Sequence, residues 1–490
     1  MDFNHQSRNK KRYQPNLVIM NKPLKSSKNK FIFFLILSFA ITVSVSGQQK
    51  TITEKFKKET VLKIDSLLQE NYIFPDKAKL IGNHLKNAYK EGKFKKYDLL
   101  DSFAVALTKE VRFINNDKHL GIWPKFIPPV DEKKEVDKDS YEIYLHNYTD
   151  NRKRANGFRE VKLIDSNVGY IKYNNFIHET DQTIDSYMHL LENADAIIID
   201  LRSNGGGSPK TVQYFCSYFF KDPILLNTLY FRKDNYTEEF WVKKVNGKKM
   251  IDVPLFIITS PKTFSGAEEF SYNMQTQKRA TIIGETTGGG ANPGEVFDIN
   301  NRLEMFAPNG TGINPLTKTN WEGVGVIPEY KTTPDMAYDK AVELAQKTAF
   351  DYRNRKAAES KKLYLELQAT INQQTKPINE TDLAKMDQQI FNAVKNLAES
   401  DLYKEDDIVA LTFQYTKTKP FIAESILKSN SELHPNSPIA FLKYGDMLEQ
   451  NGKKNNAIAA LKKAVDIATE IKAPYLDGLK NRYESVLKGK

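Results

Sequence analysis

The sequence predicts an α/β core with a helical region before it and another after it. Short β-rich runs alternate with helical patterns in the middle of the chain, amphipathic stripes precede them, and strand-like runs disappear after about residue 350. We therefore expect five parts. They are a leader at 1–47, an N-terminal helical domain at 51–128, a linker at 129–157, the core at 158–349 and a helical tail at 351–490.

The leader carries most of the basic excess. The chain of 490 residues has a formal net charge of +11, but residues 1–47 hold eight Lys or Arg and one acid. Without this segment the net charge falls to +4. The remaining balance predicts no nucleic-acid partner.

The leader is typical of an export signal. An apolar run, 31–45, follows a basic stretch and is shorter than the roughly 20 residues that a membrane span needs. Small residues then favour cleavage after Gly47, and Met20 is an alternative start. We expect an exported protein, periplasmic or extracellular. The alternative is an uncleaved N-terminal anchor, which is the only predicted membrane contact.

Three amphipathic stretches define the N-terminal helical domain. Apolar residues recur on one face of 55–72, and Pro75 is expected to end this helix. Two more helical patterns cover 80–90 and 98–113. The charged, tyrosine-rich linker shows no clear period.

The first candidate site in the core is a glycine turn. A buried strand is expected from Ile197 to Leu201, and Asn204–Gly207 follows at its carboxyl end, where open α/β sheets bind ligands. Consecutive glycines let backbone amides approach a substrate and stabilise an oxyanion. A phosphate-binding loop is an alternative, although no Gly-Lys-Ser/Thr follows. A simple tight turn is another.

The second candidate is Ser265. A buried strand from Leu255 to Thr259 ends in a polar turn, and a helix is expected to begin near this serine. The hydroxyl is well placed as a nucleophile, with the amide of Gly266 as an oxyanion donor. Alternatively, Ser265 only caps the helix, with Glu268 completing a capping box.

Two further residues suit acid–base roles. His119 follows the helical domain, and an imidazole with a pKa near neutrality suits proton transfer from serine. Glu322 precedes Gly-Val-Gly and an expected strand that ends before Pro328, and a carboxylate there could orient the imidazole. A structural histidine and an unrelated glutamate are the alternatives to these roles.

Seven segments in order resemble one serine peptidase family, that of C-terminal processing proteases, tricorn proteases and interphotoreceptor retinoid-binding proteins. The segments are NYIFPDKA, NNDKHLGI, NGFREVKLIDSNVGYIKYNNF, AIIIDLRSNGGG, TSPKTFSGAEEF, TIIGETTGGG and EGVGVIPE. The resemblance covers about residues 60 to 346. It implies a crotonase-like ββα superhelix as the core fold.

The resemblance also implies the catalytic style. Processing proteases use a serine–lysine dyad and carry a PDZ domain, but GETTGGGANPG contains no lysine and the chain is too short for a PDZ domain between His119 and Val168. The tricorn-like branch uses serine, histidine and glutamate. By this resemblance Ser265 is the nucleophile, His119 the base and Glu322 the orienting group.

The same resemblance implies the oxyanion donors, the substrate and the cofactor requirement. The donors would be the amides of Gly266 and of Gly205 or Gly206. The substrates would be peptides or unfolded proteins, and no cofactor or metal is expected. The single cysteine, Cys216, also excludes a thiolate metal site and is expected to be inert packing.

The histidine segment departs from the usual Gly-Asp-Gly-His-Thr. Lys118 adds a charge that would lower the pKa of His119 if it lay close, and Leu120 removes a hydroxyl. Lys262 is an alternative base. The departure also motivates an alternative function, a catalytically impaired family member that acts as a ligand- or protein-binding module.

The tail resembles one and a half tetratricopeptide repeats. The unit is marked by Phe441, Tyr444, Gly445, Leu448, Ala457, Leu461 and Ala464. The second half of a preceding unit fits around Ala423 to Pro435. A helical cap on the core and an arm for a protein partner are equally compatible with it.

Overall fold

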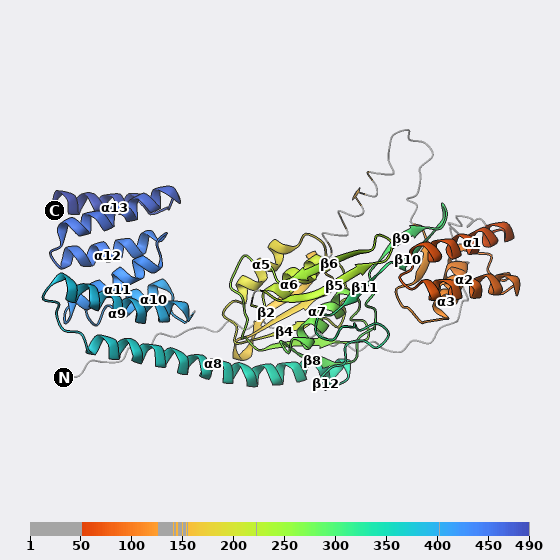
Figure 1. Ribbon diagram of the computed structural model, residues 1–490, viewed down its shortest axis with the longest axis horizontal. Coiled ribbons are helices and arrows are strands. Elements are labelled where there is room, and N and C mark those ends of the chain that lie inside the picture. The colour runs from red at the N-terminus through yellow and green to blue at the C-terminus, as the bar shows by residue number, and fades with distance from the viewer. Residues whose placement is uncertain are drawn as a thin grey trace, which may run out of the picture. The chain divides into compact units, whose positions relative to one another are not determined.

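Figure 1 shows the computed structural model of the chain. The structure describes residues 51–125, 155–221, 223–400 and 402–489, with five single residues between 141 and 153. The predicted leader and most of the predicted linker lie outside the described residues, so their predictions stay untested. Within the described ranges, no helix combines the length and apolar character that a membrane crossing requires.

The core is built on a six-stranded sheet, in agreement with the predicted α/β class. Its strand order is β12-β8-β7-β4-β3-β2, and all neighbours are parallel except the β2–β3 pair. The strands are β2 (Phe158–Ile164), β3 (Val168–Tyr173), β4 (Ala196–Asp200), β7 (Leu255–Thr259), β8 (Thr281–Gly284) and β12 (Tyr330–Lys331). Two 3₁₀ turns, η1 (Ala155–Gly157) and η2 (Asp165–Asn167), flank β2.

Helices cover both faces of this sheet, which explains why β4 and β7 are apolar on both faces until their last residues, Asp200 and Thr259. In β4, Ile197 and Ile199 face the layer of α5 (Asp181–Leu190), α6 (Pro209–Ser217) and α7 (Gly266–Thr276). Ile198 faces the first half of α8 (Pro334–Asn372) instead. That half presents alanines at every fourth position, so its backbone can lie close to the sheet. These alanines are Ala337, Ala341, Ala345 and Ala349.

Two small antiparallel sheets were not predicted. One has the order β11-β5-β6, with β5 (Leu225–Phe231), β6 (Tyr236–Trp241) and β11 (Gly310–Ile313). The other has the order β1-β10-β9, with β1 (Gly121–Pro124), β9 (Gly294–Asp298) and β10 (Leu303–Pro308). The second sheet joins the N-terminal domain to the core, because β1 belongs to the former and β10 to the latter.

The N-terminal helices form as predicted, with shifted bounds. They are α1 (Glu54–Asn71), α2 (Pro75–Lys90) and α3 (Leu100–Arg112). Tyr72 ends α1, and Pro75 begins α2 instead of terminating the previous helix, as the fixed φ of proline allows at a first helical position. The buried side chains of these helices share one hydrophobic cluster with Leu303 and Met305 of β10.

The tail consists of helices, and α8 runs through the expected boundary near residue 350. The helices are α9 (Glu380–Glu399), α10 (Glu405–Leu411), α11 (Pro420–Leu433), α12 (Pro438–Gln450), α13 (Lys454–Glu470) and α14 (Leu476–Lys488). A Cβ added to Gly445 of α12 would lie 2.8 Å from Leu461 Cγ of α13, so these two helices pack closely. The tetratricopeptide assignment itself stays a prediction.

One local prediction is wrong. The segment before Pro328 forms turns and not a strand, and the next strand is β12. Gly323 and Gly325 both adopt positive φ, +74° each, which breaks the extended conformation there.

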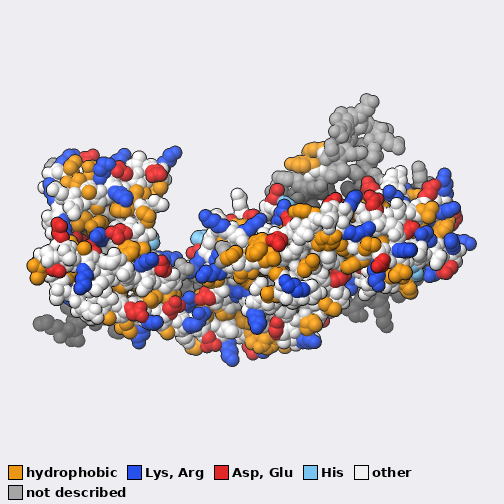
Figure 2. Space-filling model, in the orientation of Figure 1, with side chains coloured by type: hydrophobic (Ala, Val, Ile, Leu, Met, Phe, Trp, Pro, Cys, Tyr) orange, Lys and Arg blue, Asp and Glu red, His pale blue; other side chains and the backbone are white. Residues whose placement is uncertain are grey.

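Basic and acidic side chains are interspersed over the face shown in Figure 2. No broad field of one sign covers that face, which agrees with the small charge excess outside the leader.

Candidate active site

Two turns meet at the carboxyl ends of the neighbouring parallel strands β4 and β7, as expected for this sheet type. The Thr263 hydroxyl donates to the carbonyl of Leu201 at 2.8 Å. The backbone N–H of Phe264 donates to the carbonyl of Asn204 at 3.0 Å. These bonds fix the turn that carries Ser265 against the glycine turn.

Ser265 lies at the start of α7 in an unusual backbone conformation. Its φ is 53° and its ψ is −122°, a region that costs a non-glycine residue about 1–3 kcal/mol. Its backbone N–H donates to the carboxylate of Glu268 at 2.9 Å, but its hydroxyl makes no capping hydrogen bond. The two residues nevertheless adopt the capping-box arrangement that the sequence predicts, although the hydroxyl makes no regular hydrogen bond to the helix end.

The glycine turn lies directly against this serine. A Cβ on Gly206 would lie 2.8 Å from Ser265 Cβ. The Gly206 amide is already bound, because it donates to Asn204 Oδ1 at 2.8 Å. This bond argues against Gly206 as an oxyanion donor. Gly205, in contrast, has open space around it, and neither its amide nor that of Gly266 bonds to another described residue.

Glu268 organises the nucleophile side. Besides the Ser265 amide, its buried carboxylate accepts from Thr287 Oγ1 at 2.5 Å and from the amides of Gly289 and Gly290 at 2.6 and 2.8 Å. Burial raises the pKa of this carboxyl, and the four hydrogen bonds oppose the rise. The carboxylate thus holds the 287–290 loop against the start of α7.

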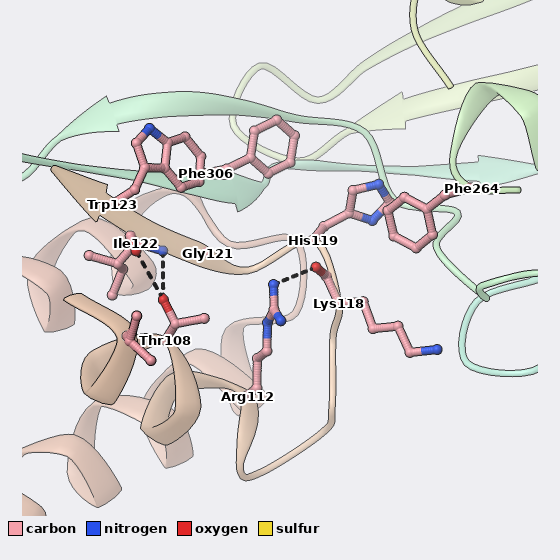
Figure 3. A pocket seen from close by; sticks show the side chains of 10 residues that line it. Thr108, Arg112, Lys118, His119, Gly121, Ile122, Trp123, Phe264 and Phe306 are labelled. Carbon is pink, nitrogen blue, oxygen red and sulfur yellow. Dashed lines mark hydrogen bonds between the residues drawn. The ribbon is translucent and has the colours of Figure 1, made fainter. Parts of the chain in front are cut away.

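His119 reaches the site from the N-terminal domain. Its ring lies on Phe264, with 4.6 Å between the ring centroids, and on Phe306, at 5.8 Å (Figure 3). Its Cε1 lies 2.7 Å from where a Cβ on Gly290 would be. The structure therefore brings His119 beside the residue that precedes Ser265. Its Nδ1 is buried, and no hydrogen-bond partner for it exists among the described residues.

The charge on His119 is governed by its surroundings. Burial lowers the pKa of the imidazole, and Arg112 lowers it further, whereas Asp117 raises it. Lys118 was expected to lower this pKa only if it lay close, and it is not among the groups that shift it. The Lys118 ammonium points to the carbonyl of Gly288 and donates to it at 2.5 Å, and the cation that acts on His119 is Arg112.

Sequence reasoning gave no role to Asp117, although it lies two residues before the histidine. Its buried carboxylate accepts from the backbone N–H of His119 at 2.9 Å and from the Tyr72 hydroxyl at 2.7 Å. Asn115 Nδ2 donates to the same hydroxyl at 2.7 Å. Asp117 also raises the pKa of Glu322, so its charge acts on both residues.

Glu322 borders the loop of residues 290–291, and no hydrogen bond between Glu322 and His119 is present among the described residues. Its carboxylate accepts from the amide of Ala291 at 2.6 Å, while Trp321 Nε1 donates to the carbonyl of Gly290 at 2.8 Å. Burial, with a smaller effect of Asp117, raises the pKa of Glu322 to about 7. It therefore supports the 290–291 loop.

The structure gives no catalytic environment to the remaining sequence candidates. Lys262 is exposed, so nothing removes water from its ammonium as a lysine base requires. Leu120 is fully buried in the N-terminal core. Cys216 is fully buried, which raises the pKa of its thiol well above the usual range and agrees with inert packing. No group of His, Cys, Asp and Glu suited to a metal ion occurs in the described part of the chain.

Comparison with known proteins identifies two domains. The model of peptidase family S41 matches residues 167–332, and the model of the N-terminal domain of peptidase S41 in eukaryotic IRBP matches residues 52–154. The two matches include all the candidate residues, with Ser265 and Glu322 in the first and His119 in the second.

Individual relatives match over shorter stretches. A carboxyl-terminal-processing protease of Synechocystis is 29% identical over 124 residues, which is 25% of this chain and 28% of that protein. The chloroplastic carboxyl-terminal-processing peptidase 3 of Arabidopsis thaliana is 22% identical over 36% of this chain and 34% of its own. Both matches thus span about a third or less of the relative. A solved structure, a putative peptidase from Parabacteroides merdae, aligns with 59% of this chain and 96% of its own, at 16% identity and a TM-score of 0.43.

Proposed function

Because the chain carries the two domains of peptidase family S41, we propose that it is a serine-type peptidase that hydrolyses peptides or unfolded proteins through an acyl-enzyme on Ser265. The observation that carries this proposal is the state of that serine. It has a strained backbone, a hydroxyl without a regular capping hydrogen bond and a histidine ring beside the preceding residue.

In the proposed first step, His119 accepts the proton of the Ser265 hydroxyl as Oγ attacks the scissile carbonyl. The amides of Gly266 and Gly205 stabilise the resulting oxyanion, aided by the N-terminus of α7. The protonated imidazole then gives its proton to the departing amine, and the C–N bond breaks. Water, deprotonated by His119, hydrolyses the ester and restores the serine.

The lowered pKa of His119 supports its role as the base, because a neutral imidazole is the form that accepts a proton. Glu322 is proposed to stabilise the imidazolium through its charge, since no hydrogen bond joins the two residues. Asp117 is proposed as a positioning residue, because it binds the backbone N–H of His119 and opposes the lowering of its pKa.

The proposal also covers the leader, the fold of the core and the helical tail. We propose that residues 1–47 direct export, that the core follows the crotonase-like superhelix, and that the tail is tetratricopeptide-like. The basic and apolar pattern of the leader supports the first point. The close packing at Gly445 supports the last, because repeat helices pack through small residues.

A serine-directed fluorophosphonate probe tests the nucleophile. Wild-type protein should be labelled, Ser265→Ala should not, and Ser203→Ala should label like wild type, because Ser203 is an exposed serine of the glycine turn. Equal labelling of wild type and Ser265→Ala would show that the assignment is wrong.

A binding module without turnover is the second candidate function. The buried, unpartnered Nδ1 of His119 favours it, because no group fixes the tautomer of the base. Hydrolysis of casein by wild type, and its loss in His119→Ala with retained folding, would reject the binding module. Labelling without any casein hydrolysis would favour it.

A further inference from the structure

A pocket of about 470 Å³ opens beside His119 on the side of the N-terminal domain (Figure 3). We call it the β1 pocket. Its walls are aromatic, formed by Trp123 of β1, Phe306 of β10 and Phe264. Val105 of α3 lies at its rim and is 70% exposed. Because the imidazole also lines the pocket, whatever fills it lies next to the proposed base.

The walls of the pocket are fixed before any ligand arrives. The Thr108 hydroxyl donates to the carbonyl of Ile122 at 3.1 Å and accepts from its amide at 2.9 Å, which ties β1 to α3. Trp123 Nε1 donates to the Glu304 carboxylate of β10 at 2.5 Å. A preformed apolar wall of this kind binds without a large ordering cost.

The charges at the pocket select against a basic ligand. None of its lining residues is acidic, and it contains two cations, Arg112 and Lys118. Both cations donate to backbone carbonyls, Arg112 to those of Leu120 and Lys118 at 2.6 and 2.8 Å, and Lys118 to that of Gly288. A Lys or Arg side chain in the pocket would therefore meet two like charges and no acidic lining residue, and the nearby Glu304 carboxylate already accepts from Trp123.

We propose that the β1 pocket binds a bulky apolar side chain, aromatic or long aliphatic, of the peptide chain whose scissile bond lies at Ser265. This inference rests on the proposed function, because it takes Ser265 and His119 as the reacting pair. The pocket thus sets the substrate class of the enzyme: unfolded segments with a large apolar residue near the cleaved bond, in preference to segments with a small or basic residue there.

The first experiment measures cleavage. Reduced casein is digested with the full chain, and the cut sites are mapped by mass spectrometry. Peptides built around the most frequent cut are then compared with Phe, Ala or Lys at the enriched position. We expect kcat/KM for the Phe peptide to exceed those for the Ala and Lys peptides at least about tenfold. Equal values would overturn the proposal.

Substitution at the rim connects this preference to the β1 pocket. Val105→Trp fills the opening from an exposed helix position and should bring the Phe-to-Ala ratio close to one. Leu99→Trp is the matched control, because Leu99 is exposed at the start of the same helix and does not line the pocket. If Val105→Trp leaves the Phe-to-Ala ratio of kcat/KM unchanged, the preference does not arise in the β1 pocket, and its assignment to this pocket is wrong.

A binding measurement separates this proposal from the proposed function. Dye-labelled pentapeptides with a central Phe, Ala or Lys are titrated into full-length Ser265→Ala protein, followed by fluorescence anisotropy. The Phe peptide should bind at least about tenfold more tightly than the others, and adding Val105→Trp should remove the difference. Equal binding overturns the pocket. If the Phe peptide binds selectively but the wild type is not labelled by the fluorophosphonate, the β1 pocket assignment stands and the proposed peptidase function is wrong.

Discussion

The serine side and the histidine side of the candidate site are held in different ways. On the serine side, the Glu268 carboxylate accepts four hydrogen bonds and fixes both the start of α7 and the 287–290 loop. On the histidine side, the imidazole of His119 packs on two aromatic rings, and its Nδ1 is unpartnered. Only its backbone N–H is fixed, by Asp117.

This difference fits the division of roles in the proposed mechanism. The nucleophile and its oxyanion donors must be rigid, because their amides have to face one position of the substrate oxygen. A base that accepts and returns a proton can be positioned by ring packing, which leaves its nitrogens free. Substitutions on the two sides should therefore have different consequences.

The largest effect is expected on the serine side, from Glu268→Ala. Removing the carboxylate leaves four donors without their acceptor, so we expect the free energy of unfolding to fall by about 3–5 kcal/mol. Chemical denaturation of the full chain measures it. Glu268→Gln is the control, because it keeps one acceptor oxygen and should lose less. A loss below about 1 kcal/mol in Glu268→Ala would contradict the comparison.

The neighbouring Glu269 should make the stability of the serine side depend on pH. Its side chain is buried, and that burial raises its pKa to about 7, opposed only weakly by Asn227. The folded state thus prefers the protonated carboxyl. The stability that it contributes is complete below the unfolded pKa near 4.5 and is lost as the pH rises through 7.

Glu269→Gln should accordingly flatten the decline of stability between pH 4.5 and 7.5, by an amount on the order of 3 kcal/mol at the upper end. Thermal melts across this range measure the effect. The exposed Glu295→Gln serves as control and should follow the wild-type curve. A Glu269→Gln curve parallel to wild type would mean that Glu269 is already charged in the folded state.

On the histidine side, Asp117→Asn should act on the pH profile more than on folding. The carboxylate raises the pKa of His119, so its loss lowers that pKa, and the acid limb of the activity moves to lower pH. The rate of fluorophosphonate labelling against pH reports this limb. Tyr72→Phe removes the hydrogen bond to Asp117 but keeps the Asp117 charge. The acid limb of the pH profile of this variant should therefore stay near that of the wild type. Equal shifts in both variants would indicate a structural role only.

The smallest effect on stability is expected from Ser265→Gly. Glycine relieves the strain of the positive φ of 53°, so the free energy of unfolding should be about 1 kcal/mol higher than in the wild type. The variant should also lose fluorophosphonate labelling, because it lacks the hydroxyl. Ser265→Ala keeps the strain and should stay close to wild type in stability. A destabilised Ser265→Gly would show that the strain is not stored at this position.

The central sheet was predictable because its pattern is local. The apolar runs at Val168–Tyr173 and Leu255–Thr259 have the bounds of β3 and β7. The small sheets were missed because β9, β10 and β11 are short and partly exposed, and because the β1–β10 and β11–β5 pairs join segments far apart in the sequence. The false strand before Pro328 shows the opposite error, since its apolar residues are interrupted by glycines with positive φ.

The sequence predicts candidate residues by type and order, but it does not predict their contacts. His119 lies against Phe264, the residue before Ser265, but Gly206 uses its amide internally, and Lys118 donates to the carbonyl of Gly288. Such details depend on where one side chain or amide points, which no spacing in the sequence encodes. Glu268 did have a signal, the Ser-x-x-Glu pattern, yet three of its four hydrogen bonds come from a loop about twenty residues away.

The pairing of β1 with β10 has a consequence for the order in which the molecule matures. His119 precedes β1 directly, and Gly121 pairs with Phe306, nearly two hundred residues later. In a nascent chain the imidazole cannot reach its place until β10 has been synthesised and has joined β1, a contact of high sequence separation that forms late. If Ser265 and His119 are the reacting pair, the protein is inert as long as it is incomplete, and its own unfinished chain is safe from it.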